Sequence, residues 1–423
     1  MPNLAFPACS KDLLQDALEI LPNDLDTKMT DALKTLEPDQ AAAVLAYIAQ
    51  QASITDQQIK KSRLTLPSFS SAKWAEVAPQ LDLPDKVDDL LLESFSPPSC
   101  MLPLSMHRAM FKDGWRAMDV YREKTQQDRE AARIKLLEPW LVPIIALFEG
   151  RVVDLPESAM VPTIYSSGGA VEHEIIVVGR ALFFVVEMKL LLDKDCTAQL
   201  FLELLSAAEA NKKLKYTGLR VYGLLTDLTL FHFYSFDPIE RSFYKDDVLF
   251  ANVIRELFCG DMIPVANKIF SVLMLGYLES LEATVALSKA RGQSGMCSSD
   301  KGSSPIHQMA DKPSILASSS GAKQSKGASS HVRPSLTAWE NGLALAKQAY
   351  DDLQKCALAE SIDKFEENAI NALDTLSKSV SCLPRYSLYS GPSDTPITPA
   401  GLDAMADKSV KIWHVDKLAK TRP

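Results

Sequence analysis

The sequence predicts an α/β protein in which a mixed β-sheet is flanked by helices, with helical extensions at both ends of the chain. Short apolar segments rich in β-branched and aromatic residues lie between about residues 150 and 245. A helical pattern at 197–213 separates two of them, as a crossover between parallel strands requires. Longer helical patterns precede and follow this region. Together these observations favour a sheet covered by helices.

Changes in composition divide the 423 residues into five predicted parts. Serine accounts for 13 of the 48 residues at 290–337, where six Lys or Arg residues stand against two acids. Such a segment buries too little apolar surface to offset its chain entropy, so we expect disorder there. The parts are a helical N-terminal region (1–105), the α/β domain (106–289), a disordered linker (290–337), a C-terminal helical segment (338–382) and a flexible tail (383–423).

The predicted α/β domain opens with a helical run from Met106 that is bent or divided at Pro139 and Pro143 and ends at Gly150. A helix over 262–290 closes the domain. The strands predicted between them are 152–155, 171–178, 181–189, 219–227, 230–236 and 241–245. Strands 181–189 and 219–227 are expected to be parallel, because the helix at 197–213 connects them.

The segment VEHEIIVVGRALFFVVEMK, residues 171–189, predicts a β-hairpin. Gly179 and Arg180 would form a two-residue turn, since glycine readily adopts the positive φ of tight hairpins. In that register Glu172 lies directly opposite Glu187. Side chains alternate along a strand, so Glu172, Glu174, Glu187 and Lys189 all fall on one face.

Three acids gathered at one end of a buried strand pair repel one another unless something compensates their charge. A divalent cation would do so, and Mg²⁺ often uses one or two protein carboxylates together with water and substrate phosphate. A lysine on the same face can orient or polarise a water molecule. The pattern therefore predicts metal-assisted hydrolysis of a phosphodiester.

An apolar strand that ends in Glu187-Met188-Lys189, after acids on the neighbouring strand, resembles the PD-(D/E)XK nuclease superfamily. The runs FLELLSAAEANKK and VYGLLTDLTLFHFYSFDP are similar to those of uncharacterised fungal proteins grouped with it. The resemblance covers about residues 125 to 250 and implies a restriction-endonuclease-like core. The first acid departs from the usual pattern, being a glutamate instead of an aspartate, and no proline precedes it.

Carried onto this sequence, the resemblance implies site residues and a cofactor. Glu187 would be the second acid and Lys189 the catalytic lysine, while Gln199 on the following helix would be an auxiliary catalytic residue. The first acid would be Glu172 or Glu174, so that Glu172, Glu174 and Glu187 are the candidate ligands of Mg²⁺. The expected substrate is nucleic acid, DNA more than RNA.

Several features also have an ordinary structural interpretation. Folds of this kind can lose catalysis and keep binding, so a catalytically inactive scaffold that binds protein partners through its helical extensions is the alternative function. Glu203 lies one turn beyond Gln199 and could join the site, although a solvated helix carboxylate is the simpler interpretation. His173 is expected on the opposite face from Glu172, where it would be packed or exposed.

Composition also limits the kinds of partner and the cellular location that we expect for this protein. A net charge of −9 and an isoelectric point near 5.3 argue against an extended basic coat for nucleic acid. The seven cysteines show no metal-ligand spacing and predict reduced thiols. No signal peptide or membrane-spanning segment is expected, since apolar runs such as 269–278 are too short. We therefore expect an intracellular protein, nuclear or cytoplasmic, without membrane partners.

Overall fold

The computed structural model describes residues 66–177, 181–294, 335–384 and 403–412. Most of the predicted N-terminal region and linker lie outside these ranges. Contacts divide the chain into two units, of which the larger comprises Phe69–Thr163 and Gly168–Pro423 and contains the sheet.

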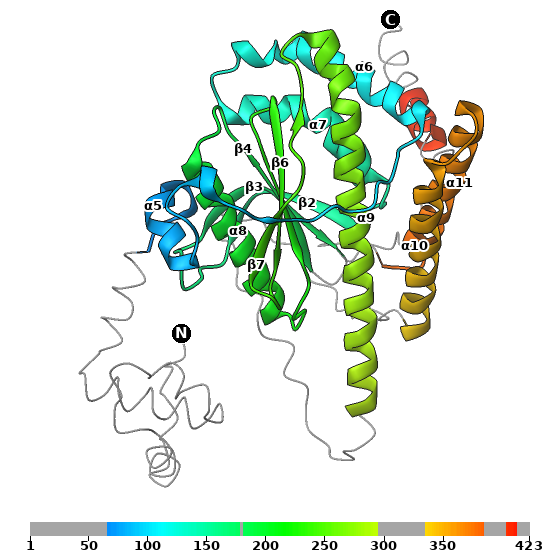
Figure 1. Ribbon diagram of the computed structural model, residues 1–423. Helices are drawn as coiled ribbons and strands as arrows, with labels where there is room; N and C mark the ends of the chain where they lie inside the picture. The colour runs from blue at the N-terminus through cyan, green and yellow to red at the C-terminus, as the bar shows by residue number, and fades with distance from the viewer. Residues whose placement is uncertain (1–65, 178–180, 295–334, 385–402, 413–423) are drawn as a thin grey trace, which may run out of the picture. The chain divides into compact units, whose positions relative to one another are not determined.

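The expected α/β class is confirmed by a mixed eight-stranded sheet with helices on both faces (Figure 1). The strand order is β1-β7-β6-β5-β4-β3-β2, and β8 pairs with β6. The strands are β1 (Glu93–Ser94), β2 (Val152–Met160), β3 (Gly169–Val177), β4 (Leu182–Met188), β5 (Val221–Thr226), β6 (Leu230–Asp237), β7 (Ser242–Lys245) and β8 (Leu249–Phe250). β4 and β5 are parallel, as predicted from the helix that joins them.

Two helical layers enclose the sheet. The longer helices are α6 (Leu104–Tyr121), α7 (Glu130–Ala146), α8 (Lys194–Lys213), α9 (Arg255–Ser294), α10 (Leu336–Cys356) and α11 (Ile362–Ser381), with a short α5 at Trp74–Val77. α8 packs on one face, where Leu200 and Leu204 lie against Gly223 of β5. α7 and α9 cover the other face, and α10 and α11 form a helical hairpin beside α9 (Figure 1).

The first long helical run, predicted to be bent or divided at its prolines, is not divided there. Pro139 and Pro143 both lie inside α7, and the break falls between α6 and α7. Arg122 ends α6 with a left-handed φ of 71°, and the short 3-10 helix Lys124–Gln126 follows it. The chain therefore turns at a backbone conformation that the sequence did not reveal, while the prolines are tolerated within the helix.

The β3–β4 pairing contains a bulge that the predicted hairpin lacked. His173 pairs with Val186 and Ile175 with Phe184, but Ile176 pairs with Leu182, so Phe183 is an extra residue. The bulge turns the fully buried Phe183 ring toward Gly276 of α9. The predicted turn at Gly179-Arg180 lies outside the described residues.

The long helix α9 is unusually apolar. α9 is the one helix in the described ranges that is long and apolar enough to cross a membrane, but 72% of its most apolar window is buried inside the protein, which fits a core helix of a soluble protein. It continues to Ser294, into the start of the predicted linker. Residues 403–412, within the predicted flexible tail, are helical with exposed side chains.

The described cysteines are free thiols: Cys100, Cys196, Cys259, Cys356 and Cys382. The other two, Cys9 and Cys297, lie outside the described residues.

Candidate functional site

The site begins at the end of the buried strand β4. All seven residues of this strand are buried. Glu187 is the one charged residue among them and is only 3% exposed. Glu187 faces α8, because its partner position on β5, Leu225, shares the face of Gly223. A carboxyl group at such a position needs partners, since isolated buried charge is costly.

Lys189 supplies the first partner of Glu187. Its Nζ lies 2.5 Å from Glu187 Oε1 and 3.9 Å from Glu130 Oε2 at the start of α7. The backbone N–H of Lys189 donates to the carbonyl of Thr226, which extends the β4–β5 ladder by one residue. Burial lowers the pKa of Lys189, but the negative charge of Glu187 outweighs this effect and raises it, so the ammonium stays charged.

Gln199 approaches the same carboxyl from α8. Asp193 caps this helix by accepting from the Cys196 N–H at 3.0 Å, and this start places Gln199 on the buried face. Its Nε2 donates to Glu187 Oε1 at 2.5 Å and to Glu203 Oε1 at 2.8 Å. Gln199 therefore links two carboxyl groups, one from the sheet and one from its own helix.

Glu172 closes the group from the neighbouring strand. His173 pairs with Val186, so the next positions on the two strands are Glu172 and Glu187, as the sequence predicted. The carboxyl of Glu172 accepts a hydrogen bond from the Met188 N–H. Burial and the charge of Glu187 raise the pKa of Glu172 to about 9.

The carboxyl cluster, as we call it, consists of Glu172, Glu187, Lys189, Gln199 and Glu203. Glu174, the other candidate for the first acid, is not part of it. Glu174 lies opposite Leu155 and Val185, and its carboxyl forms a hydrogen bond with Ser158 of β2. The structure thus distinguishes two residues that alternation alone placed on the same face.

Two acids of the site, Glu203 and Glu130, lie outside the predicted set of metal ligands and catalytic residues. Glu203 is fully buried, contrary to its interpretation as a solvated helix carboxylate. Its position one turn beyond Gln199 on the same helix face was the signal by which the sequence named it as a possible member of the site. Glu130 comes from a helix more than fifty residues away in sequence, and no local pattern indicates its contact with Lys189.

The protonation of the cluster follows from its burial. Burial and the charge of Glu187 raise the pKa of Glu203 well above its ordinary value. Burial also raises the pKa of Glu187, while Lys189 and a hydrogen bond with Glu203 oppose the rise. A hydrogen bond between two carboxyl groups requires one proton between them. Without a cation the cluster therefore holds protons near neutral pH.

The donor set suits a hard cation such as Mg²⁺. Oε2 of Glu187 and Oε2 of Glu203 are buried and receive no hydrogen bond from an amide, amine or hydroxyl group of the described residues. Within the described ranges no group of three or more His, Cys, Asp or Glu side chains is placed to hold a metal ion. One or two carboxylates nevertheless suffice for Mg²⁺ when water and a phosphate complete its octahedron.

His173 and Arg133 support the surroundings of the cluster. His173, which was expected to be packed or exposed, is buried, and its Nδ1 lies 2.7 Å from Asp154 Oδ2 on β2. Arg133 of α7 donates to the carbonyls of Lys189 and Leu190 at 3.1 and 2.5 Å. These bonds fix the chain immediately after β4, and they hold Lys189 near Glu187.

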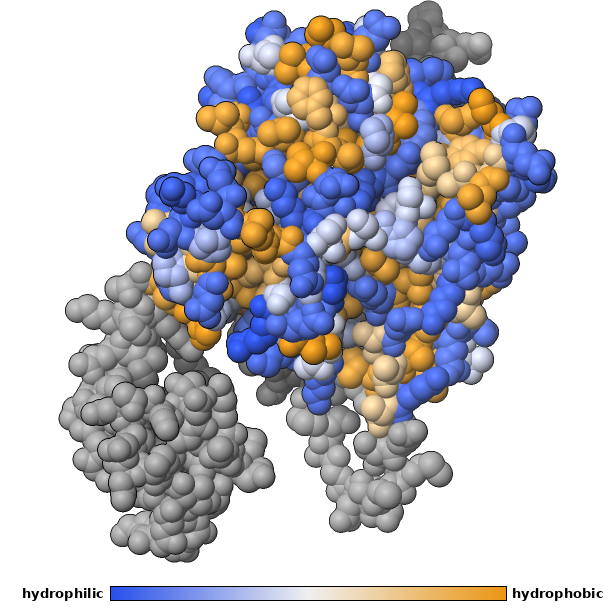
Figure 2. Space-filling view, in the orientation of Figure 1, coloured by the Kyte–Doolittle hydropathy of each residue, from blue (hydrophilic) through white to orange (hydrophobic). Residues whose placement is uncertain are grey.

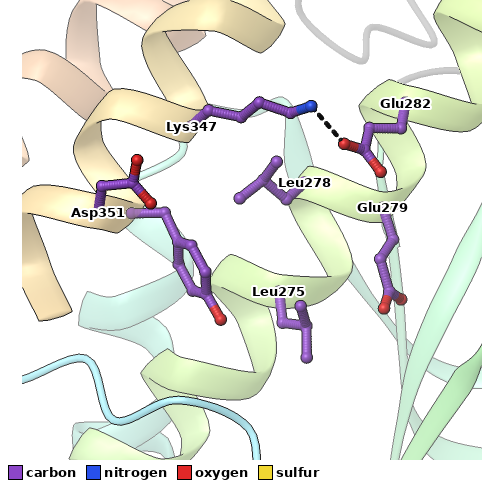
Figure 3. A pocket seen from close by; sticks show the side chains of 7 residues that line it. Leu275, Leu278, Glu279, Glu282, Lys347 and Asp351 are labelled. Atoms are coloured by element: carbon purple, nitrogen blue, oxygen red, sulfur yellow. Dashed lines mark ion pairs between the residues drawn. The ribbon is translucent and has the colours of Figure 1, made fainter.

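A separate cavity of about 390 Å³ lies between α9 and α10 (Figure 3). Lys347 spans its edge to Glu282, with an Nζ–Oε1 distance of 2.6 Å. Glu279 accepts from the Tyr222 hydroxyl, and burial raises the pKa of Glu279 to about 7. None of the predicted site residues lines this cavity, so it is distinct from the carboxyl cluster.

Comparisons with family models, curated proteins and solved structures found no match for this chain. Its function is therefore inferred from the geometry of its own residues.

Proposed function

We propose that this chain is a Mg²⁺-dependent phosphodiesterase of the PD-(D/E)XK type that hydrolyses nucleic acid, DNA in preference to RNA. The observation that carries the proposal is a pair of buried carboxyl oxygens beside Lys189, Oε2 of Glu187 and Oε2 of Glu203, which receive no hydrogen bond from an amide, amine or hydroxyl group of the described residues. Such oxygens are costly unless a cation or a proton compensates them. Glu172 and Glu187 would hold Mg²⁺, which would supply Lewis-acid stabilisation of the developing phosphate charge.

The remaining residues have roles that follow from their contacts. Lys189, held by Glu187 and Glu130, can orient a water molecule toward the phosphorus atom. Gln199 fixes the Glu187 carboxylate by donating to Oε1, which leaves Oε2 available. Substrate would approach on the side of Lys189, whose side chain is 15% exposed and is followed by the exposed Leu191.

The direct test is cleavage of supercoiled plasmid DNA and of single-stranded RNA with Mg²⁺, Mn²⁺ or EDTA. Glu187→Gln and Lys189→Met are each expected to reduce the cleavage rate by about 100-fold or more. Glu174→Gln, on the same strand pair but outside the cluster, and the exposed Lys194→Gln are matched controls that should retain activity. Equal inactivity of all proteins on both substrates, with native circular dichroism, would refute the proposal.

A second candidate function is a non-catalytic scaffold that binds protein partners. It is favoured by the ion pair between Lys189 and Glu187 and by the proton between Glu187 and Glu203. Both compensate the negative charge of the carboxyl cluster without a metal ion. Thermal unfolding with and without Mg²⁺ separates the two functions. A metal site should raise the melting temperature in proportion to the logarithm of metal concentration above its Kd, whereas a metal-free scaffold should not respond.

A further inference from the structure

Exposed apolar side chains gather where β8 leads into α9. Phe250, which pairs with Leu230 of β6, is 57% exposed, and Ile254, just before α9, is 60% exposed. Hydrophobic side chains gather over the first turns of α9 in the space-filling view (Figure 2). We call this surface the β8–α9 patch, and its residues are Leu230, Val248, Phe250, Val253, Ile254 and Leu257. Neighbouring exposed apolar residues of this kind are typical of an interaction site.

The segment that forms most of this patch, residues 247–257, also carries uncompensated negative charge. Asp247 and Glu256 are exposed, and neither forms an ion pair within 4.0 Å with a described residue. Arg255 is the cation of the segment, but its guanidinium already donates to Asp119 and Glu123. A partner for the patch should therefore combine apolar side chains with positive charge.

The helix at 403–412 is exposed along its whole length. Helical periodicity makes one side of it apolar, and the residues of that side are Met405, Ala406, Val410 and Ile412. Lys408 and Lys411 lie on the other side. Isolated helices shorter than roughly 12–15 residues are only marginally stable in water, and most helices in proteins are stabilised by packing of an apolar face. This short helix therefore requires a surface on which to pack.

The charge of the C-terminal segment complements that of the patch. Residues 403–423 contain five Lys or Arg residues and three Asp residues, whereas the whole chain has a net charge of −9. An isologous contact between two copies of the patch would instead bring a second set of the same acids to one interface. An anionic membrane surface would also repel these acids.

The connection to the helix is long enough to reach the patch. The Tyr277 hydroxyl lies 3.1 Å from Ser379 Oγ near the end of α11. Tyr277 and Arg255 are separated by about 33 Å along α9 at the helical rise of 1.5 Å per residue. Residues 385–402 connect α11 to the helix, and a chain of that length extends up to about 60 Å.

We propose that the helix at 403–412 docks on the β8–α9 patch of its own chain. The apolar side of the helix would cover the patch, and Lys408 and Lys411 would lie toward Asp247 and Glu256. Both surfaces would then bury apolar side chains that each now exposes to water. The proposal does not depend on phosphodiester hydrolysis.

Hydrogen exchange of the full-length protein, followed by mass spectrometry, tests this proposal. The amides of 407–412, which are bonded within the helix, should exchange at least about tenfold more slowly in the wild type than in Phe250→Glu or Ile254→Glu. Leu358→Glu, at an exposed apolar position between α10 and α11, is the matched control and should keep the slow exchange. All three positions are exposed, so each variant should retain a native circular dichroism spectrum.

Charge reversal separates docking from an effect on the helix alone. Lys408→Glu combined with Lys411→Glu should accelerate exchange at 407–412 several-fold, and adding Asp247→Lys and Glu256→Lys should restore slow exchange. Fast exchange at 407–412 in the wild type would overturn the proposal, as would slow exchange that persists in both Phe250→Glu and Ile254→Glu. Protection that increases with protein concentration would assign the helix to a second copy, and it too would overturn docking within one chain.

Discussion

Replacement of Glu172 by glutamine should stabilise the metal-free protein, by an amount that grows with pH. The amide keeps an oxygen to accept the Met188 N–H but needs no proton to remain neutral. In the wild-type protein, burial and the charge of Glu187 raise the pKa of Glu172 from 4.5 to about 9. The folded state therefore retains a proton that the unfolded chain releases above about pH 4.5.

The sign and size of the effect follow from proton linkage. Because the folded state binds more protons than the unfolded state, the free energy of unfolding falls as pH rises, by about 1.4 kcal/mol for each pH unit per group. The contribution of Glu172 is fully favourable below about pH 4.5 and is lost progressively up to about pH 9. Near pH 7.5 the wild-type protein should be less stable than Glu172→Gln by up to about 4 kcal/mol.

Urea unfolding in EDTA at several pH values between about 4.5 and 9 measures this difference. Glu209→Gln, at a partly exposed position of α8, serves as the control and should follow the wild-type curve. If Glu172→Gln and the wild type instead have parallel stability profiles, the carboxyl of Glu172 ionises without cost. In that case it is not buried beside Glu187, and the described cluster is incorrect.

Three further predictions concern other parts of the fold. Gly276→Ala should destabilise the protein by about 1–3 kcal/mol in urea, because the new Cβ would overlap the Phe183 ring, and adding Phe183→Leu should restore part of the loss. Asn211→Ala should cost about 2–3 kcal/mol, measured in the same way, since its side chain bonds both the N–H and the carbonyl of Leu182. Glu279→Gln should remove a decline in melting temperature between about pH 4.5 and 7, because burial raises the pKa of Glu279 to about 7. If the melting temperature of that variant still declined over this pH range, the result would contradict the described burial of the Glu279 carboxyl.

The sequence predicted the fold class because its strands are marked by simple composition and the parallel β4–β5 pair by the helix between them. It also predicted that Glu172 lies opposite Glu187. The two-residue turn behind that prediction places Val177 opposite Leu182, whereas Ile176 pairs with Leu182, and the bulge restores the predicted register farther from the turn. The bulge at Phe183 could not be predicted locally. It depends on the space that Gly276 leaves in α9, more than ninety residues later.

The positions of the acids in the site also depend on contacts that local sequence does not predict. Alternation placed Glu174 beside Glu172, but the hydrogen bond with Ser158 on β2 engages its carboxyl elsewhere. Glu203 was interpreted as solvated because most helix carboxylates are, whereas the packing of α8 on the sheet buries it completely. Glu130 reaches the site only through the tertiary placement of α7. Pairing within one hairpin can be predicted from the sequence, but contributions from separate helices need the assembled fold.

The most direct test of the proposed metal site is anomalous diffraction from crystals of the protein soaked in Mn²⁺, which replaces Mg²⁺ at oxygen ligands. The proposal predicts one strong anomalous peak within bonding distance of carboxylate oxygens from both Glu172 and Glu187, and its loss in crystals of Glu187→Gln. Crystals in which the cluster retains the Lys189–Glu187 ion pair and no anomalous peak, at millimolar Mn²⁺ and with bound oligonucleotide, would contradict it.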